Sequence, residues 1–276
     1  MEMKIRWPSK TAPAHLKGKD TGSKNAAVRI GNTHKIGSRE SQQDSFGISD
    51  ISDARLCREK GVFAVAADGM GGLSNGAEVS AIVTSYMLNY FAKTTFGDDL
   101  SMELLTMALN ANDEVLRFLK ENGNVQCGST VVAAIIKDYS LNFISVGDSR
   151  IYIDRGGVLY QVNREHTYAS ELDEKAARSE ISIEEAKNDP QRHALTSYIG
   201  MEEPLRIDRN LRPIPLAAGD RVLLMTDGVT GAVSDEEIQK AAALDAYEAA
   251  AKLESLVESK KKKNQDNYTA IVIECL

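Results

Sequence analysis

The strongest constraint on the fold of this chain is a set of short apolar segments that each meet an aspartate. The run VFAVAA at residues 62–67 is suited only to burial, yet it stops at Asp68 and passes directly into Gly69. An aspartate before a glycine at a strand end is an ordinary turn. Four more aspartates stand at the ends of apolar segments in the same way: Asp44 before SFGI, Asp148 after NFISVG, Asp227 after RVLLMT and Asp266 before NYTAIVIE.

Five aspartates at strand ends would gather negative charge at one edge of a core if the strands lie side by side. Carboxylates crowded in this way repel one another and are costly to desolvate. Carboxylate and carbonyl oxygens are the ligands that Mg²⁺ and Mn²⁺ prefer, and Gly69 would let the backbone approach an ion closely. The pattern therefore predicts a divalent-metal site at the sheet edge, and the alternative is that each aspartate only ends a strand.

The remaining sequence predicts an α+β domain, because strands and helices come in blocks and do not alternate strictly. Gly147-Asp148 and Gly156-Gly157 are expected to form hairpin-type turns. Residues 164–200 are polar, helical in character and broken by Pro190, and they form a long insertion between strands. The expected strands are 26–33, 45–48, 62–67, 129–136, 140–146, 150–154, 158–162, 221–226 and 268–274, and the expected helices are 77–91, 101–121, 235–243 and 245–260.

Composition narrows the class of protein. The chain has 276 residues, 42% of them hydrophobic, and a formal net charge of −7, which argues against a dedicated nucleic-acid binder. No apolar run approaches the length that crosses a bilayer, and the three cysteines are too far apart to predict a disulfide framework. We expect a cytoplasmic protein with a mobile basic leader at residues 1–24 and one domain at residues 25–276.

Seven short motifs, read in order, resemble one known family. They are SRESQQDS, AVAADGMGG with GAEVS, CGSTVV, ISVGDSR, PQRHALTSYIG, LLMTDGV and QDNYTAIVI, spread over about residues 26–276. In this order they resemble the metal-dependent Ser/Thr protein phosphatases of the PPM (2C-type) family in its bacterial form. The resemblance implies a four-layer α/β/β/α sandwich, in which two central antiparallel sheets are flanked by helices and the metals lie in a cleft at the sheet edges.

The resemblance also implies a set of metal ligands. By position, Asp68 resembles the carboxylate that bridges two tightly bound Mn²⁺ or Mg²⁺ ions, and Gly69 the residue that offers its carbonyl. Asp227 and Asp266 match the other carboxylate ligands of this pair. Asp148, together with Asp227, matches the site of a third, weaker ion, although Asp148 as a mere turn cap is the alternative.

Two further positions match parts of the family's catalytic site. Asp44 matches a carboxylate that holds metal-bound water, and Arg39 matches the arginine that binds the substrate phosphate; a plain surface arginine is the alternative. The chain departs from the family pattern at Gln42 and Gln43, where Asn and Glu are more usual. Met70 stands where animal members carry a histidine considered a general acid.

The implied activity is hydrolysis of phosphoserine and phosphothreonine in proteins by a water that bridges the metals, with Asp68, Asp227 and Asp44 as the catalytic residues. The implied partners are phosphorylated protein substrates and a cognate bacterial Ser/Thr kinase, with no nucleic acid or membrane and with the chain as a monomer. Two other functions stay open. One is a pseudophosphatase that only binds phosphoproteins, and the other is a metallohydrolase that acts on small phosphate esters.

Two groups of residues are more simply explained by structure than by catalysis. His34, His166 and His193 are read as ordinary polar or half-buried histidines, and His166, at the start of the insertion, is the best placed of them to assist catalysis. Lys260–Lys263 could steer phosphorylated partners. The simpler interpretation is a solvated helix C-terminus, where cations suit the helix dipole.

Overall fold

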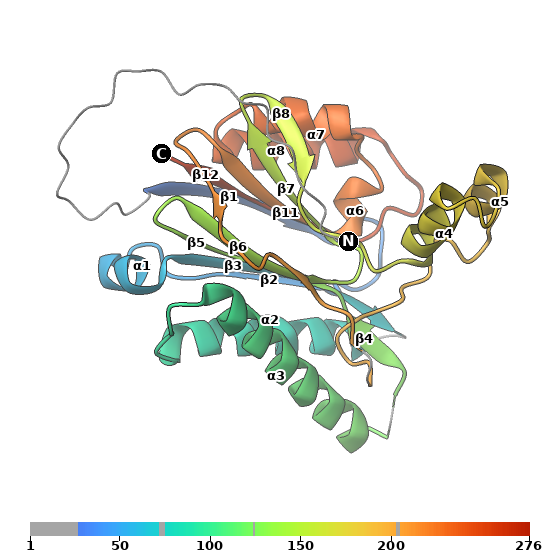
Figure 1. Cartoon of the computed structure of the whole chain (residues 1–276), viewed down its shortest axis with the longest axis horizontal. Helices are drawn as coiled ribbons and strands as arrows, with labels where there is room; N and C mark the ends of the chain where they lie inside the picture. The colour runs from blue at the N-terminus through green and yellow to red at the C-terminus, as the bar shows by residue number, and fades with distance from the viewer. Residues whose placement is uncertain (1–26, 72–74, 124, 203–204) are drawn as a thin grey trace.

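The fold consists of two antiparallel sheets packed face to face, with helices on both outer faces (Figure 1). The computed structural model describes residues 27–71, 75–123, 125–202 and 205–276. The predicted leader, residues 1–24, lies outside the described residues. The predicted four-layer α/β/β/α sandwich is confirmed. None of the helices in the described part of the chain combines the length and the apolar character needed to cross a membrane.

The first sheet has five strands in the order β1-β12-β11-β7-β8, and each neighbouring pair is antiparallel. Helices α7 and α8 cover its outer face, and the four-residue α6 follows β11 directly (Figure 1). The bounds of these elements are β1 Val28–Lys35, β7 Arg150–Arg155, β8 Val158–Gln161, β11 Arg221–Met225, β12 Tyr268–Cys275, α6 Asp227–Thr230, α7 Asp235–Ala242 and α8 Ala246–Ser259.

The second sheet has seven strands, five of them in the order β10-β6-β5-β3-β2, while β4 pairs with β3 and β9 with β6. Helices α2 and α3 cover its outer face, and α1 lies at one end of it (Figure 1). The bounds are β2 Asp44–Ile48, β3 Val62–Gly71, β4 Cys127–Ser129, β5 Val131–Lys137, β6 Ser140–Val146, β9 Asp208–Arg209, β10 Ile214–Pro215, α1 Ala54–Lys60, α2 Asn75–Lys93 and α3 Leu100–Glu121.

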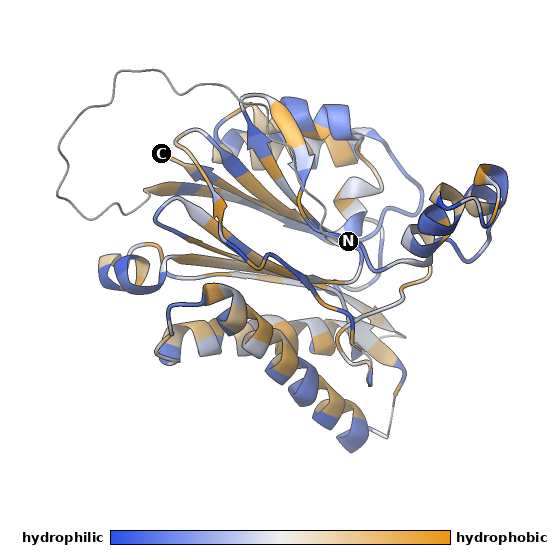
Figure 2. Ribbon diagram, viewed as in Figure 1, coloured by the Kyte–Doolittle hydropathy of each residue, from blue (hydrophilic) through white to orange (hydrophobic). Residues whose placement is uncertain are grey.

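The central strands are apolar on both faces because both faces are buried. In β3, Phe63 and Val65 pack toward α2 and α3, whereas Ala64 and Ala66 pack toward the other sheet. Figure 2 shows hydrophobic residues concentrated between the sheets and under the helices, with hydrophilic residues on the outer surface. This double burial explains why VFAVAA lacks the apolar–polar alternation of a strand with one wet face.

One of the two predicted hairpin turns is wrong. Gly156 and Gly157 do form a tight hairpin between β7 and β8, and both have positive φ. Gly147 and Asp148, in contrast, connect β6 in the seven-stranded sheet to β7 in the five-stranded sheet. The chain crosses between the layers here, which a pattern of short strands and glycine turns cannot distinguish from a hairpin.

Four short elements, α1, α6, β9 and β10, are absent from the sequence-based prediction, and only Ser129 of β4 falls within an expected strand. Helix α1 has no buried residue and is held by its N-cap, where the Asp53 carboxylate accepts hydrogen bonds from the backbone N–H groups of Arg55 and Leu56. The two β-strands are two residues long each. Elements this short, or without a buried face, carry no hydrophobic periodicity to detect.

The predicted insertion, residues 164–200, is called the flap below. It contains α4 (Tyr168–Ala177) and α5 (Ile183–Asn188), which project beyond the sandwich (Figure 1). Thr167 caps α4, and Ser182 and Glu185 form a capping box on α5. The two ends of the flap meet, since Thr167 pairs with Leu195 in an antiparallel bridge.

The core beneath α3 allows a matched test of burial. Met107 is fully buried against the seven-stranded sheet, whereas Met102 on the same helix is 45% exposed. We expect Met107→Ala to lower the free energy of unfolding by about 2–5 kcal/mol, and Met102→Ala to change it by less than about 0.5 kcal/mol. Urea denaturation of both variants measures the difference, and equal losses would contradict the assigned core face of α3.

Candidate metal centre

The strand register brings the predicted carboxylates to one edge of the sandwich. Asp44 lies directly opposite Asp68 in the pairing of β2 with β3. In the other sheet Met225 pairs with Ala270, so Asp227 after β11 and Asp266 before β12 emerge at the same edge. Asp148 follows β6 where the chain crosses between the sheets. The five aspartates therefore come from both sheets and converge on one end of the interface between them.

Asp44 is the most deeply buried of these groups and links the two sheets. Only 5% of the residue is exposed, and its Oδ2 accepts hydrogen bonds from Thr226 Oγ1 at 2.9 Å and Thr269 Oγ1 at 2.6 Å. Burial raises the pKa of Asp44 to about 7, the threonine hydrogen bonds oppose this rise, and Asp227 and Asp266 add to it. Its Oδ1 is buried with no hydrogen-bond partner.

The carboxyl groups of Asp68 and Asp227 are neighbours, so one can donate a hydrogen bond to the other when it is protonated. Burial raises the pKa of Asp68 well above its usual range, and the charges of Asp44 and Asp227 raise it further. Burial also raises the pKa of Asp227, whose Oδ1 is buried without a partner. The pKa of Asp148 rises to about 7, first by burial and then by the charge of Asp227. These pKa shifts record first the burial of the four carboxyl groups and then the repulsion among them, which water screens poorly.

Gly69 stands where no side chain would fit. A Cβ built on it would lie 2.0 Å from the carbonyl oxygen of Gly76 and 2.7 Å from that of Gln43. Its N–H donates to the same Gln43 carbonyl at 3.0 Å. The crowding requires glycine at this position and keeps two backbone carbonyl oxygens close to the residue that follows Asp68.

Arg39 and Asp266 form an ion pair at the rim. Arg39 Nη2 lies 2.7 Å from Asp266 Oδ2, and the two side chains are 53% and 38% exposed. The loop that carries Arg39 is fastened to the strand leading to Asp266, because Ser38 donates to the Gln265 carbonyl through both its N–H, at 2.9 Å, and its hydroxyl, at 3.0 Å. The loop that carries Arg39 is therefore held beside the segment that carries Asp266.

The donor set fits a hard divalent cation. Within the described ranges no group of three or more His, Cys, Asp or Glu side chains is already arranged around an ion position, in keeping with the Asp68–Asp227 and Arg39–Asp266 contacts. Among the five aspartates of the centre, two buried carboxylate oxygens, Asp44 Oδ1 and Asp227 Oδ1, nevertheless lack a hydrogen-bond partner in the described part of the chain. Unsatisfied buried acceptors among crowded carboxylates are what a bound Mg²⁺ or Mn²⁺ would neutralise.

Comparison with known proteins identifies this arrangement. The family model described as "Protein phosphatase 2C" matches residues 30–265. The chain belongs to the protein phosphatase 2C family. The matched region covers most of the sandwich, including β2, β3, the flap and β11, and it ends one residue before Asp266.

The relatives of this phosphatase-family chain carry consistent names. It is 27% identical to "Serine/threonine phosphatase stp" of Listeria innocua over 206 residues, which are 73% of this chain and 77% of the relative. It is 30% identical to "Serine/threonine protein phosphatase PstP" of Mycobacterium tuberculosis over 231 residues, 81% of this chain and 43% of that protein. A solved structure of the PstP catalytic domain in complex with two manganese ions is similar, with a TM-score of 0.70, 25% identity and coverage of 90% of this chain and 98% of that one.

Several residues of the centre were not singled out from the sequence. Thr226 and Thr269 hold Asp44, and Thr130 connects Asp68 to the Asp148 turn. The Thr130 Oγ1 accepts from the Asp68 N–H at 3.2 Å and lies 2.8 Å from Ser149 Oγ. The available signal was a threonine inside or beside an otherwise apolar strand, and a polar residue there needs a buried partner.

The centre opens into a pocket of about 510 Å³ between the sandwich and the flap. Asp148 and Asp227 line it from the sandwich, and Arg192 and His193 line it from the flap. His193 is exposed. The pocket places flap residues next to the carboxylates, although 45 positions separate Asp148 from His193 in the sequence.

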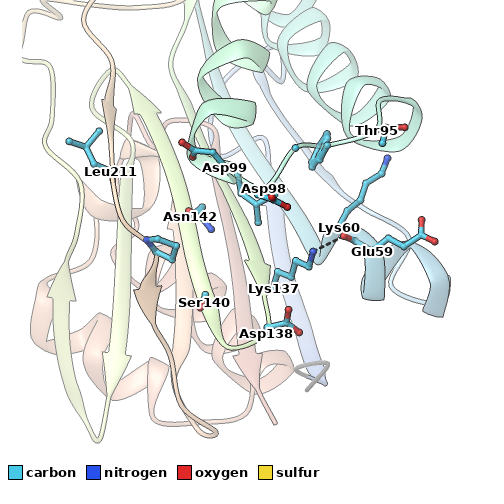
Figure 3. A pocket seen from close by; sticks show the side chains of 14 residues that line it. Glu59, Lys60, Thr95, Asp98, Asp99, Lys137, Asp138, Ser140, Asn142 and Leu211 are labelled. Atoms are coloured by element: carbon cyan, nitrogen blue, oxygen red, sulfur yellow. Dashed lines mark hydrogen bonds between the residues drawn. The ribbon is translucent and has the colours of Figure 1, made fainter. Parts of the chain in front are cut away.

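A second pocket, of about 780 Å³, shares no lining residue with the pocket at the metal centre. Figure 3 shows the side chains that line it. It adjoins the beginning of β3, at the end opposite Asp68. Its two lysines bind backbone carbonyls at the C-terminal ends of helices. Lys60 Nζ donates to the Ala92 carbonyl of α2 at 3.0 Å, and Lys137 Nζ donates to the Glu59 carbonyl of α1 at 2.8 Å. We therefore do not include this pocket in the candidate site.

The crowding of acids predicts an unusual pH dependence when divalent cations are removed. The pKa of Asp148 rises from its ordinary 3.8 to about 7 in the folded protein, so the folded state binds more protons than the unfolded state between these values. Its contribution to stability is therefore fully present at low pH and is lost as the pH rises from about 4 to about 7. Asp148→Asn should show a smaller loss of unfolding free energy between pH 5 and pH 7.5 in chelator than the unsubstituted protein.

The measurement is urea denaturation at both pH values, with Asp98→Asn as the control because Asp98 is exposed and lines the distant pocket. If Asp148→Asn and the unsubstituted protein lost stability equally, Asp148 would not carry the raised pKa.

Proposed function

We propose that this chain is a Mn²⁺- or Mg²⁺-dependent phosphatase that hydrolyses phosphoserine and phosphothreonine in proteins. The observation that carries the proposal is the pair of buried, partnerless carboxylate oxygens, Asp44 Oδ1 and Asp227 Oδ1, at the edge where the two sheets meet. The names of the Listeria and Mycobacterium relatives, which are serine/threonine phosphatases, support the substrate class.

The proposed ligands of two tightly bound ions are Asp68, the Gly69 carbonyl, Asp227 and Asp266. Asp148, together with Asp227, would hold a third, weaker ion, since the pKa of Asp148 responds to the charge of Asp227. Bound divalent cations would acidify a bridging water and neutralise charge on the phosphoryl group. The manganese-bound PstP structure supports this choice of metal.

One carboxylate oxygen of Asp44 is available for catalysis. The other, Oδ2, accepts hydrogen bonds from Thr226 and Thr269, and these bonds fix the orientation of the carboxylate. Oδ1 remains to accept a hydrogen bond from a water at the centre. The backbone N–H of Asp44 is bound by the Gln42 side chain at 3.1 Å, which gives one of the two departures from the family pattern a supporting role.

Arg39 is suited to bind the phosphate of the substrate. Its guanidinium is 53% exposed at the rim, and the one ion pair to Asp266 leaves most of its N–H donors for a phosphate. A guanidinium binds phosphate bidentately and stays charged. When Asp266 turns toward a cation, the arginine would be released to the substrate.

The proposed activity also implies a partner kinase, a cellular compartment and an oligomeric state. A phosphoprotein phosphatase opposes a kinase, and we propose a bacterial Ser/Thr kinase as the cognate partner. All three cysteines are free, which supports work in the reducing cytoplasm. The net charge of −7 supports protein substrates over nucleic acid. We propose that the chain acts as a monomer, with the basic leader 1–24 ahead of a catalytic domain at 25–276 and without a membrane partner.

Metal dependence is the first test. Asp68→Ala and Asp227→Ala should each reduce manganese-stimulated hydrolysis of a phosphothreonine peptide to below about 1% of the unsubstituted rate, because each removes a ligand. EDTA should abolish turnover and Mn²⁺ should restore it. Asp98→Ala, the same chemical change at the distant pocket, is the matched control and should retain full activity.

The same assay separates the alternatives. Circular dichroism should show both aspartate variants folded, because they alter a cleft and leave core volume intact. Substantial manganese-dependent turnover by either variant would overturn the assignment. Phosphopeptide binding without hydrolysis would indicate a pseudophosphatase, and turnover of small phosphate esters alone would indicate a small-molecule hydrolase.

Arg39 supplies a second test. Arg39→Ala should lower kcat/KM for phosphopeptides by about 10- to 100-fold, mainly through KM, because a charge-assisted hydrogen bond contributes about 1.5–3 kcal/mol. Arg39→Lys should recover part of the loss. Arg55→Ala is the control, since Arg55 forms a comparable exposed ion pair, with Glu59, away from the centre. An unchanged KM for Arg39→Ala would show that Arg39 is a surface arginine that does not bind the substrate phosphate.

A further inference from the structure

The position of the Asp148 carboxylate depends on the glycine before it. Gly147 has φ of +103°, and a Cβ on it would lie 2.7 Å from both Cβ and Cγ2 of Thr130. The residue therefore sits in a backbone conformation that only glycine adopts readily, pressed against Thr130. Such a turn has no side chain of its own to fix it. Whatever holds the backbone of Gly147 sets the direction of Asp148.

His166 holds Gly147 on both sides. The His166 backbone N–H donates to the Gly147 carbonyl at 2.7 Å, and the Gly147 N–H donates to His166 Nδ1 at 3.1 Å. Both backbone polar groups of the glycine are thus bound by one residue, 19 positions away. Since Nδ1 accepts here, the neutral ring carries its proton on Nε2. Burial lowers the pKa of His166, which favours this neutral form.

His166 also belongs to the root of the flap. Its carbonyl accepts a hydrogen bond from the Thr196 N–H at 2.8 Å, on the returning end of the flap. The next residue, Thr167, pairs with Leu195 and caps α4. A short chain of hydrogen bonds therefore runs from Thr196 through His166 to Gly147, and Asp148 is the next residue.

The other end of the same root touches Asp68. Ile199 and Ser129 exchange two backbone hydrogen bonds, at 2.8 and 2.9 Å, and Ser129 Oγ donates to the Asp68 carbonyl at 3.0 Å. The contact with Asp68 goes through β4, which is part of the sheet, whereas the contact with Gly147 goes through one residue, by the backbone N–H and the ring of His166. The flap residue Glu165 also pairs with Arg150, at 2.7 Å, but only the His166 ring bonds directly to the turn before Asp148 among the described residues.

We propose that His166 is a positioning residue, which joins the root of the flap to the Asp148 turn and so sets the affinity of the Asp148–Asp227 subsite for its cation. The proposal rests on the proposed function for the identity of that cation. His166 does not serve as a ligand through Nδ1, because that atom is bound to Gly147. His193, in contrast, is exposed in the pocket, and the described residues give it no hydrogen bond to the Asp148 turn.

Two substitutions separate the hydrogen bond from the bulk of the ring. His166→Leu removes the acceptor at Nδ1, whereas His166→Asn places a carbonyl oxygen where Nδ1 stood. Amide hydrogen exchange at Gly147 in the full-length, cation-free protein is the first readout. We expect faster exchange in His166→Leu and protection close to that of the unsubstituted protein in His166→Asn. Equal protection of Gly147 in all three proteins, or equal loss in both variants, overturns the proposal.

The second readout is calorimetric titration with Mn²⁺. Replacement of a residue that orients a ligand typically weakens metal affinity by about 10- to 100-fold. We expect His166→Leu to lower the affinity for the third ion by that factor and to leave the affinities for the two tightly bound ions unchanged. His166→Asn should restore most of the affinity for the third ion. A third ion that binds all three proteins equally, or no third ion in the unsubstituted protein, overturns the proposal.

These two measurements can disprove the role of His166 without disproving the proposed phosphatase activity, and the reverse is also true. The exchange of Gly147 is measured without cations or substrate, so it tests the link even if the chain hydrolyses nothing. Loss of manganese-dependent turnover in Asp68→Ala tests the activity without reference to His166. Thermal unfolding of His166→Leu shows whether the substitution acts only locally. If His166→Leu does not fold, the amide exchange of Gly147 in His166→Asn decides: protection close to that of the unsubstituted protein supports the proposal, and loss of protection overturns it.

Discussion

The structure depends on one buried carboxylate that is bound by the opposite sheet. Asp44 belongs to β2, yet its Oδ2 is held by Thr226 and Thr269 at the edge of the other sheet. Thr226 and Thr269 also bond to each other, the Thr269 N–H to Thr226 Oγ1 at 2.9 Å and the Thr226 N–H to the Thr269 carbonyl at 3.0 Å. A buried acid is costly unless it is satisfied, so this contact fixes how the two sheets meet and where the remaining carboxylates stand.

The centre and the hydrophobic core are therefore parts of the same packing. The strand β3 fills the core with Phe63 and Val65 and presents Asp68 directly after the continuously buried residues 62–67. Thr130 continues this connection, since it bonds to the backbone of Asp68 and to Ser149 beside Asp148. Rigid strands that end at the centre hold the carboxylates close together despite their repulsion, which is the arrangement that a cation site requires.

The flap is joined to this rigid edge by few contacts. Thr167 and Leu195 close its root, and its bonds to the segments that carry Asp148 and Asp68 include those of His166 with Gly147, Glu165 with Arg150 and Ile199 with Ser129. Segments attached by few hydrogen bonds open at lower free energy than a packed core. A flap beside the pocket can thus adjust to a protein substrate while the strands keep the carboxylates in place.

The sequence by itself determined the apolar strands, the long helices α2 and α3 and the acids at strand ends, because burial of both sheet faces and a helical repeat leave a local pattern of residue types. It also carried, through its motifs, the resemblance to the phosphatase family. Only the tertiary structure decided that Gly147 connects two sheets, that Thr226 and Thr269 bind Asp44, and that His166 bonds to Gly147. Each of these contacts joins segments far apart in the chain, and hydrogen bonds between distant segments leave no periodic pattern in the sequence.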